Sequence, residues 1–298
     1  VSDAGLQALR SLPLPQLARL LARLQPGQRL GSDAFSLNPP HEQALAAALG
    51  WPAGPDDALP WAARQAAALG LDAGQPWGLL TPVHLHLGTD QVSLTPPWAL
   101  QLDDAGAAEV LAAVRGLFET EGFTLHLAAP QQWLATHTLF DGLATAALDR
   151  VTGRNVDPWL PDARGAGLIR RLQNEVQMLL YTHPLNDRRE AAGLPTVNSL
   201  WLSACGRLPA ATADLPGVQV DDRLRQPALG EDWAAWCAAW QALDAGPLRT
   251  LADSGGPVQL TLCGERVAQT FTPAPQGLWQ RLASRWQQPA VHPVLEAL

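Results

Sequence analysis

Apolar residues recur at helical spacing through the first quarter of the chain, in segments that each end at glycine or proline. Residues 14–24, 42–50 and 60–70 show this spacing, and leucine and alanine fill most of the apolar positions. Apolar residues three and four positions apart share one face of a helix, so each segment is predicted to form an amphipathic helix. We therefore expect residues 1–75 to form a helical N-terminal subdomain.

The pattern changes after residue 76, where strand-like and helix-like periods alternate. Residues 79–97 hold two short apolar runs on either side of Gly88–Asp90, which predicts a β-hairpin. Residues 103–122 predict an amphipathic helix with acidic residues in its first turn, where they complement the helix dipole. Residues 123–130 predict a further strand.

The remainder of the chain predicts the same mixture of elements. Residues 130–167 are expected to be mostly irregular, with one short helix within 139–151. The C-terminal part predicts a strand, a helix, a hairpin and a last helix, at residues 217–222, 231–246, 257–271 and 277–287. Strands and helices that alternate, with hairpins among them, predict an α/β (mixed α+β) fold in which a mixed sheet is covered by helices. We assign residues 76–298 to this domain.

Polar side chains are concentrated between Arg171 and Gly206, in a chain otherwise rich in alanine, leucine and proline. Residues 168–182 predict a helix whose apolar residues share one face, while polar side chains form a stripe on the far side: Arg170, Asn174, Gln177 and Tyr181. Pro184 ends this helix and begins another, because proline fits the first turn of a helix but not its interior. The segment 196–206 is almost continuously apolar and is predicted to be a central strand, buried on both faces.

The second helix places an imidazole, an amide and a guanidinium on one side, at His183, Asn186 and Arg189. Such a face suits a phosphate, a carboxylate or a buried acidic side chain. The candidate ligand-binding residues are these three, with support from Arg154, Asn174 and Asn198. The competing interpretation is a structural network, because a buried amide without a partner costs about 1–3 kcal/mol and is normally paired. The residues themselves leave both interpretations open.

Other metal or catalytic motifs are incomplete. His84 and His86 alternate along a strand and point to one face with Asp90 nearby, but two imidazoles and one acid fall short of a metal site. The three cysteines are far apart in sequence, which disfavours a disulfide framework or a CxxC metal site. The chain has no G-x-S-x-G, P-loop or G-x-G-x-x-G motif. No metal and no cofactor are therefore predicted.

Composition and charge limit the classes of partner. The 298 residues are 47% hydrophobic and 16% charged. No window approaches about 18 uncharged apolar residues, so no membrane span is expected. The first residues lack a basic region followed by an apolar run, so no signal peptide is expected and the predicted location is cytoplasmic. The net charge is −8 and all 20 basic residues are arginine, which disfavours nucleic-acid binding and leaves a small anionic ligand or a protein as the partner.

The segments RNVDPWLP and RLQNEVQMLLYTHPLNDRREAAGLPTVNSLWLSACG resemble the RpfE-type bacterial regulatory proteins, many of which carry the label phosphoglycerate mutase. The resemblance covers residues 150–206 and extends more loosely over 82–102. The later part is also similar to the archaeal-type, cofactor-independent phosphoglycerate mutases. The residues shared with those mutases are His183, Pro184, Asn186, Arg189, Gly193, Asn198, Trp201 and Gly206.

The resemblance implies a regulatory role, and the departures from the mutase pattern bear on catalysis. Those mutases belong to the alkaline-phosphatase superfamily and use two divalent metals, held by Asp and His clusters, with a Ser nucleophile. This chain has no DGxxD-like start and no Asp-His pairs that would build such a site. We therefore expect a non-catalytic, cytoplasmic regulatory protein of RpfE type that binds a small anionic ligand. The alternatives are a metal-dependent phosphoglycerate mutase or phosphatase, and a protein-interaction module that uses the exposed Pro- and Trp-rich segments 94–102 and 157–165.

Overall fold

The computed structural model of the chain describes residues 3–161, 166–210, 212, 215, 217–254, 256–274 and 290–298. Its contacts divide the chain into two compact units, one made of Val1–Ala34, Pro40–Leu45 and Leu215–Leu298, the other of Phe35–Pro39 and Ala46–Asp214. Helix α3 (Pro40–Ala48) has residues in both. This division differs from the boundary expected at residue 75, because strand pairing joins the N-terminal segment to the C-terminal part of the chain.

The unit built from the two ends of the sequence contains a three-stranded antiparallel sheet in the order β1-β9-β8. Its strands are β1 (Leu24–Gly31), β8 (Leu260–Cys263) and β9 (Val267–Pro273). Its helices are α1 (Asp3–Arg10), α2 (Pro15–Leu21), α9 (Arg225–Leu229), α10 (Trp233–Leu243), α11 (Arg249–Asp253) and α13 (Val291–Glu296), with a π-helical turn at Asp244–Leu248. The buried carboxylate of Asp244 accepts the backbone N–H groups of Gln16 and Leu17, and so caps α2 from a distant part of the chain.

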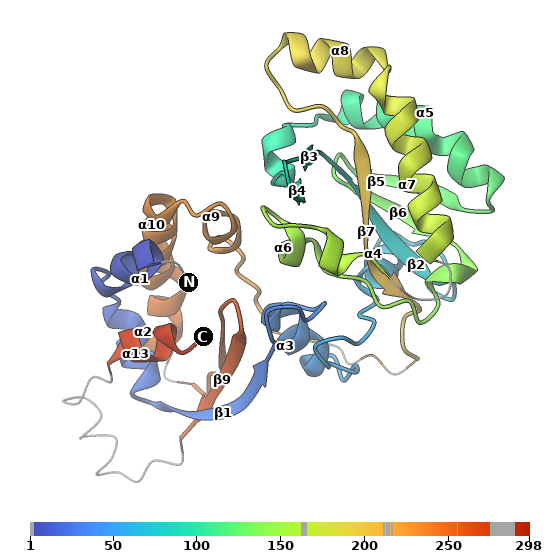
Figure 1. Cartoon of the computed structure of the whole chain (residues 1–298). Coiled ribbons are helices and arrows are strands. Elements are labelled where there is room, and N and C mark those ends of the chain that lie inside the picture. Colours follow the sequence, from blue (N-terminus) through green and yellow to red (C-terminus); the bar gives the residue numbers. More distant parts are fainter. Residues whose placement is uncertain are drawn as a thin grey trace. The chain divides into compact units, whose positions relative to one another are not determined.

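The other unit is built around a four-stranded antiparallel sheet in the order β5-β6-β2-β7 (Figure 1). Its strands are β2 (Trp77–Val83), β5 (Thr124–Ala129), β6 (Gln132–Thr136) and β7 (Ser199–Gly206), and β3 (Leu85–Leu87) and β4 (Val92–Leu94) form a separate hairpin. Its helices are α4 (Trp61–Ala68), α5 (Asp104–Thr120), α6 (Leu148–Val151), α7 (Ala166–Tyr181) and α8 (Pro184–Ala191). Short 3-10 turns are η1 (Pro97–Leu100), η2 (Thr138–Phe140) and η3 (Asp157–Trp159).

Helices cover both faces of the four-stranded sheet. Helices α5 and α7 pack over one face, where Trp133, Leu200 and Leu202 join the largest apolar cluster (Figure 1). Helix α4 packs over the opposite face, against Leu79 and Leu134. Neighbouring residues of one strand belong to opposite clusters, as the alternation of side chains along a strand requires.

The mixed α/β class, the hairpin at Gly88–Asp90 and the main predicted helices are confirmed. Every pairing between the named strands is antiparallel. Strand β6 was not predicted, since its segment was expected to be irregular. The predicted strand at 217–222 is wrong: no strand forms there, and Val218 and Val220 are 51% and 71% exposed. The helix predicted at 277–287 lies outside the described residues.

Strand β7 lies at the edge of its sheet, whereas the sequence predicted a central position. It pairs with β2 alone, yet seven of its eight residues are buried. Helices α4 and α7 contact its residues, which explains why an edge strand has a continuous apolar run. The strand bulges where its pairing with Trp77 and Leu79 shifts register, and Ala204 there adopts the left-handed region with φ 59°.

The Pro- and Trp-rich segments named as interaction surfaces were expected to be exposed, but among their described residues only Gln101, Asp157 and Pro158 are exposed. Leu100 is fully buried, and Trp159 packs into a cluster with Val83, Leu94 and Trp201. Indole rings bury large apolar areas, so these residues contribute to the core of the unit.

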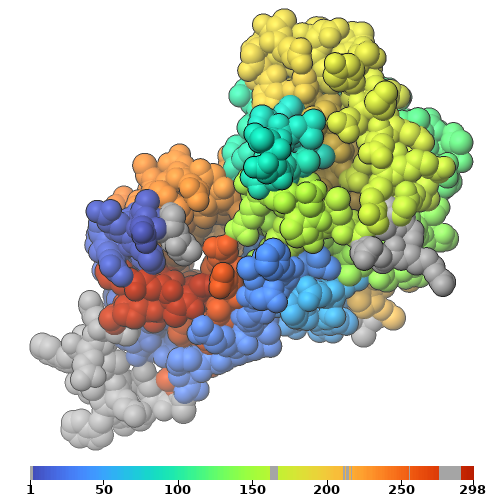
Figure 2. Space-filling model, in the orientation of Figure 1, coloured from blue at the N-terminus to red at the C-terminus, as the bar shows by residue number. Residues whose placement is uncertain are grey.

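The outer face of α7 exposes two of the large apolar side chains of this unit. Met178 and Tyr181 are 75% and 82% exposed there, and Asn174 and Gln177 of the predicted polar stripe are exposed beside them. Figure 2 shows α7 and α8, in yellow-green and yellow, at the surface. Among the described residues, no helix combines the length and the apolar character needed to cross a bilayer.

Two glycines test the packing of this unit with effects of opposite sign. A Cβ at Gly78 on β2 would lie 2.9 Å from Leu202 Cδ1 and 3.1 Å from both Cys205 Sγ and Phe140 Cε2, whereas a Cβ at Gly116 on α5 would meet nothing within 4 Å. Gly78→Ala should lower the free energy of unfolding by about 1–3 kcal/mol through overpacking. Gly116→Ala should raise it by about 0.5–1 kcal/mol, because it restricts the unfolded chain. Urea denaturation measures both, and equal effects would contradict this packing.

Candidate functional site

Helix α8 is fixed at both ends by residues that the sequence singled out. Nδ1 of His183 accepts the backbone N–H of Leu185 at 3.3 Å, which satisfies one of the free donors at the helix start. Pro184 follows at the first helical position, where its missing N–H costs nothing. Gly193 has φ 70°, a conformation that glycine adopts readily just after a helix.

Asn186 forms the centre of a buried network with the backbone. Its amide nitrogen donates to the carbonyls of Leu180 and Val197, both at 2.8 Å, and its Oδ1 accepts the N–H of Val197 at 2.9 Å. These bonds join the end of α7 and the approach to β7 to α8. The side chain is 5% exposed, so its amide is occupied by the protein itself.

Arg189 is buried next to Asn186 but is not neutralised by a carboxylate. Its Nε donates to the carbonyl of Pro195 at 2.8 Å, and its Nη2 donates to the carbonyl of Leu100. Burial lowers the pKa of the guanidinium, and the charge of Asp103 acts in the opposite direction. Among the described residues, no carboxylate oxygen lies within ion-pair distance of Arg189. A 7% exposed cation therefore has only carbonyl dipoles as hydrogen-bond partners.

Asn198 and His84 also use their side chains to bond backbone groups, next to the start of β7. Asn198 Oδ1 accepts the N–H of Leu85 at 2.7 Å, and its Nδ2 donates to the carbonyl of Leu85 at 2.9 Å. Nδ1 of His84 lies 2.9 Å from the carbonyl oxygen of Thr196. Both side chains connect β3 and the strand before it to the segment that follows α8. These groups have structural partners.

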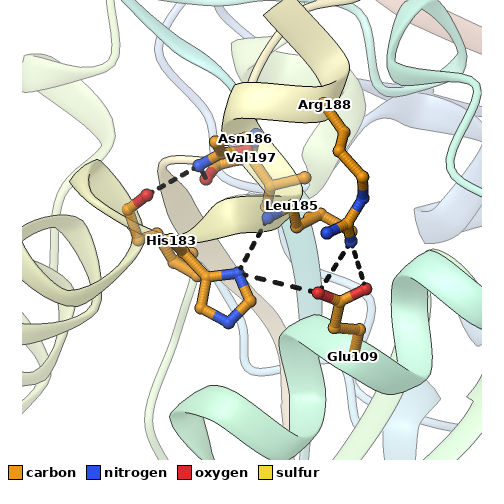
Figure 3. Close-up of polar contacts among 7 residues, drawn as sticks. Glu109, His183, Leu185, Asn186, Arg188 and Val197 are labelled. Atoms are coloured by element: carbon orange, nitrogen blue, oxygen red, sulfur yellow. Dashed lines mark hydrogen bonds and ion pairs between the residues drawn. The ribbon is translucent and has the colours of Figure 1, made fainter.

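A cluster of charged side chains lies at the surface between α5 and α8. Figure 3 shows Glu109 of α5 facing Arg188 and His183. The two oxygens of Glu109 accept from Arg188 Nη2 at 2.8 and 2.6 Å. Nδ1 of His183 lies 4.0 Å from Glu109 Oε1, and this contact becomes an ion pair when the imidazole is protonated.

This cluster borders a pocket of about 270 Å³ between α5 and α8. Its charged wall consists of Asp103, Glu109, Arg188 and Arg189, and Leu185 and Leu194 contribute apolar surface. Asp103 caps α5 by accepting the N–H of Gly106 at 2.7 Å, so the pocket also faces the positive end of a 17-residue helix. The arrangement suits a small anion that contacts the guanidinium groups.

The predicted site residues are therefore only partly brought together. Arg189 lines the pocket and His183 borders the same charged cluster, whereas Asn186 and Asn198 are used by the backbone. Asn174 is exposed on α7, and Arg154 lies beside β4, whose Leu94 N–H its carbonyl accepts. Neither Asn174 nor Arg154 lines the pocket.

Sequence reasoning missed the acidic side of the pocket and one of its two arginines: Asp103, Glu109 and Arg188. The acidic residues belong to a helix about 80 positions earlier in the chain, and only the packing of α5 against α8 brings them to the arginines. Within the described part of the chain, no group of three or more His, Cys, Asp or Glu residues is placed to hold a metal ion.

No protein-family model matches the chain, and no curated protein matches its sequence. Among solved structures, the chain is similar to a cofactor-independent phosphoglycerate mutase from Thermoplasma acidophilum, with 13% identity, 97% of this chain and 93% of that chain covered, and a TM-score of 0.38. It is also similar to a protein from Pyrococcus horikoshii, with 16% identity, 80% and 54% of the two chains covered, and a TM-score of 0.33.

The structural role of Asn186 predicts a large effect on stability. Asn186→Ala removes the partner of the buried Val197 N–H and one partner of each bonded carbonyl, so the free energy of unfolding should fall by about 3 kcal/mol. Asn174→Ala, at an exposed position on α7, is the matched control and should change it by less than about 0.5 kcal/mol. Urea denaturation of both variants measures the difference. Equal stabilities would show that the network of Asn186 contributes nothing.

Proposed function

We propose that the protein is a non-catalytic regulatory protein of RpfE type that binds a small anion in the pocket between α5 and α8. The regulatory part of the proposal rests on the resemblance over residues 150–206. The binding part rests on one observation: Arg189 is 7% exposed, has no carboxylate within ion-pair distance among the described residues, and lines a pocket. A buried cation is stabilised by a negative charge, which a bound phosphate or carboxylate supplies.

The neighbouring groups define how such an anion binds. Arg188 lies on the same pocket wall and is held by Glu109, with 59% and 39% of the two side chains exposed. An exposed ion pair of this kind contributes about 0–1 kcal/mol, so an incoming anion displaces Glu109 at little cost. The anion then contacts the guanidinium groups of Arg188 and Arg189. The displaced Glu109 also loses its contact with His183.

Two substitutions at this ion pair should change anion affinity in opposite directions. Arg188→Ala removes one guanidinium and should weaken the binding of inorganic phosphate and 3-phosphoglycerate about tenfold. Glu109→Gln removes the competing carboxylate and should strengthen it severalfold. Both residues are at the surface, so the fold is retained. Isothermal titration calorimetry at low salt measures the dissociation constants.

Arg171→Ala is the matched control, because Arg171 is an equally exposed arginine, on α7, paired with Glu121 at 2.6 Å. It should leave the affinity unchanged. Absence of binding of both anions to the wild-type protein, or equal loss in the Arg188 and Arg171 variants, would contradict the proposal. Turnover of 3-phosphoglycerate that depends on Mn²⁺ or Mg²⁺ would instead favour a mutase or phosphatase.

A further inference from the structure

A second pocket, of about 360 Å³, lies between the η1 turn and the β5–β6 hairpin. It lies outside the anion pocket, and the two have no residue in common. The residues around it carry no formal charge: Trp98, Gln101, Leu102, Ala129, Pro130, Gln131 and Gln132. Its volume falls within the range of small-molecule sites, and it combines apolar walls with a few polar groups, as such sites usually do.

Two of the three glutamine amides are held in place by the protein at one end only. Nε2 of Gln131 donates to the carbonyl of Pro97, which leaves its Oε1 as an acceptor. Oε1 of Gln132 accepts from Gln65 Nε2 at 2.6 Å, which leaves its own NH₂ group as a donor. The bond to Pro97 positions the amide of Gln131 at the pocket before a ligand arrives, which reduces the entropy lost on binding.

The third amide belongs to a residue with a strained backbone. Gln101 has φ 47° and ψ 44°, a left-handed conformation that glycine adopts more easily than any residue with a side chain. Its side chain is exposed at the pocket and offers both a donor and an acceptor. Strained residues of this kind are concentrated at ligand-binding positions.

We infer that this pocket binds a neutral sugar, with a pyranose ring packed against the indole of Trp98 and its hydroxyl groups bonded to Gln101, Gln131 and Gln132. A sugar has hydroxyl groups around its rim and an apolar C–H face, so it needs amides on several sides and a flat aromatic surface. The pocket supplies amides from two separate segments and an indole that is half-buried. The absence of formal charge among its lining residues disfavours phosphorylated ligands.

Saturation-transfer difference NMR with the methyl glycosides of glucose, galactose and mannose and with N-acetylglucosamine tests this site on the full chain. At least one glycoside should bind the wild-type protein, with its ring C–H protons receiving most saturation. Trp98→Ala should abolish the signal. Gln101→Gly should weaken binding about fivefold through the lost amide, while it raises the melting temperature because glycine relieves the left-handed strain.

Gln101→Gly should lower the affinity but raise the melting temperature, so weaker binding by this variant cannot result from a loss of folding. Gln177→Ala, at an exposed glutamine of α7, is the control and should retain wild-type binding. Arg188→Ala should also retain it, which distinguishes this site from the anion pocket. No saturation of any glycoside in the wild-type protein, unchanged affinity after Gln101→Gly, or stronger binding of adenine than of every glycoside would overturn the inference.

Discussion

The three hydrogen bonds of the Asn186 side chain determine the arrangement of the segments around α8. One amide joins the end of α7, the body of α8 and the approach to β7 at a position closed to water. If these bonds were absent, the loop from Gly193 to Asn198 would leave buried backbone groups without partners. Because they are present, Arg189 on the next turn is directed towards the carbonyls of Pro195 and Leu100. The position of the guanidinium in the pocket wall is thus a consequence of the amide network.

The network divides the same polar face into a structural centre and an edge, and the proposed anion concerns the edge alone. The groups at the centre of the face, Asn186 and Asn198, are satisfied by backbone atoms. Of the groups at its edge, Arg188 has an exposed, exchangeable carboxylate, and Arg189 has no carboxylate within ion-pair distance among the described residues. Removing a charge from water costs free energy unless an opposite charge lies close to it. A bound anion therefore stabilises most the buried charge that has no ion-pair partner. That group is Arg189.

Local features of the sequence predicted local structure well. Proline at the start of α8, glycine after its end and the apolar face of α7 act within a few residues, and each is confirmed. Features that depend on distant partners were not predictable. Strand β6 is a short apolar run that becomes a strand because β2 and β5 pair with it on both sides, and the alternating residues 217–222 form no strand. The candidate site shows the same dependence on distant partners. Asn174 and Asn186 both occupy polar positions on a helix, but only Asn186 is buried, because the loop before β7 folds back over it.

The η1 turn physically connects the two pockets. Its last carbonyl, at Leu100, accepts from Arg189 in the anion pocket, and its first, at Pro97, accepts from Gln131 in the neutral pocket. The residues that follow line both pockets, with Gln101 in one and Asp103 in the other. The bond between Arg189 and Leu100 is one of the contacts that hold the turn in front of Gln101, so the proposed anion would act on this turn if it displaced that bond. Binding free energies at coupled sites are reciprocally linked, so if both proposed ligands bind and move this turn, each would alter the affinity of the other by the same factor.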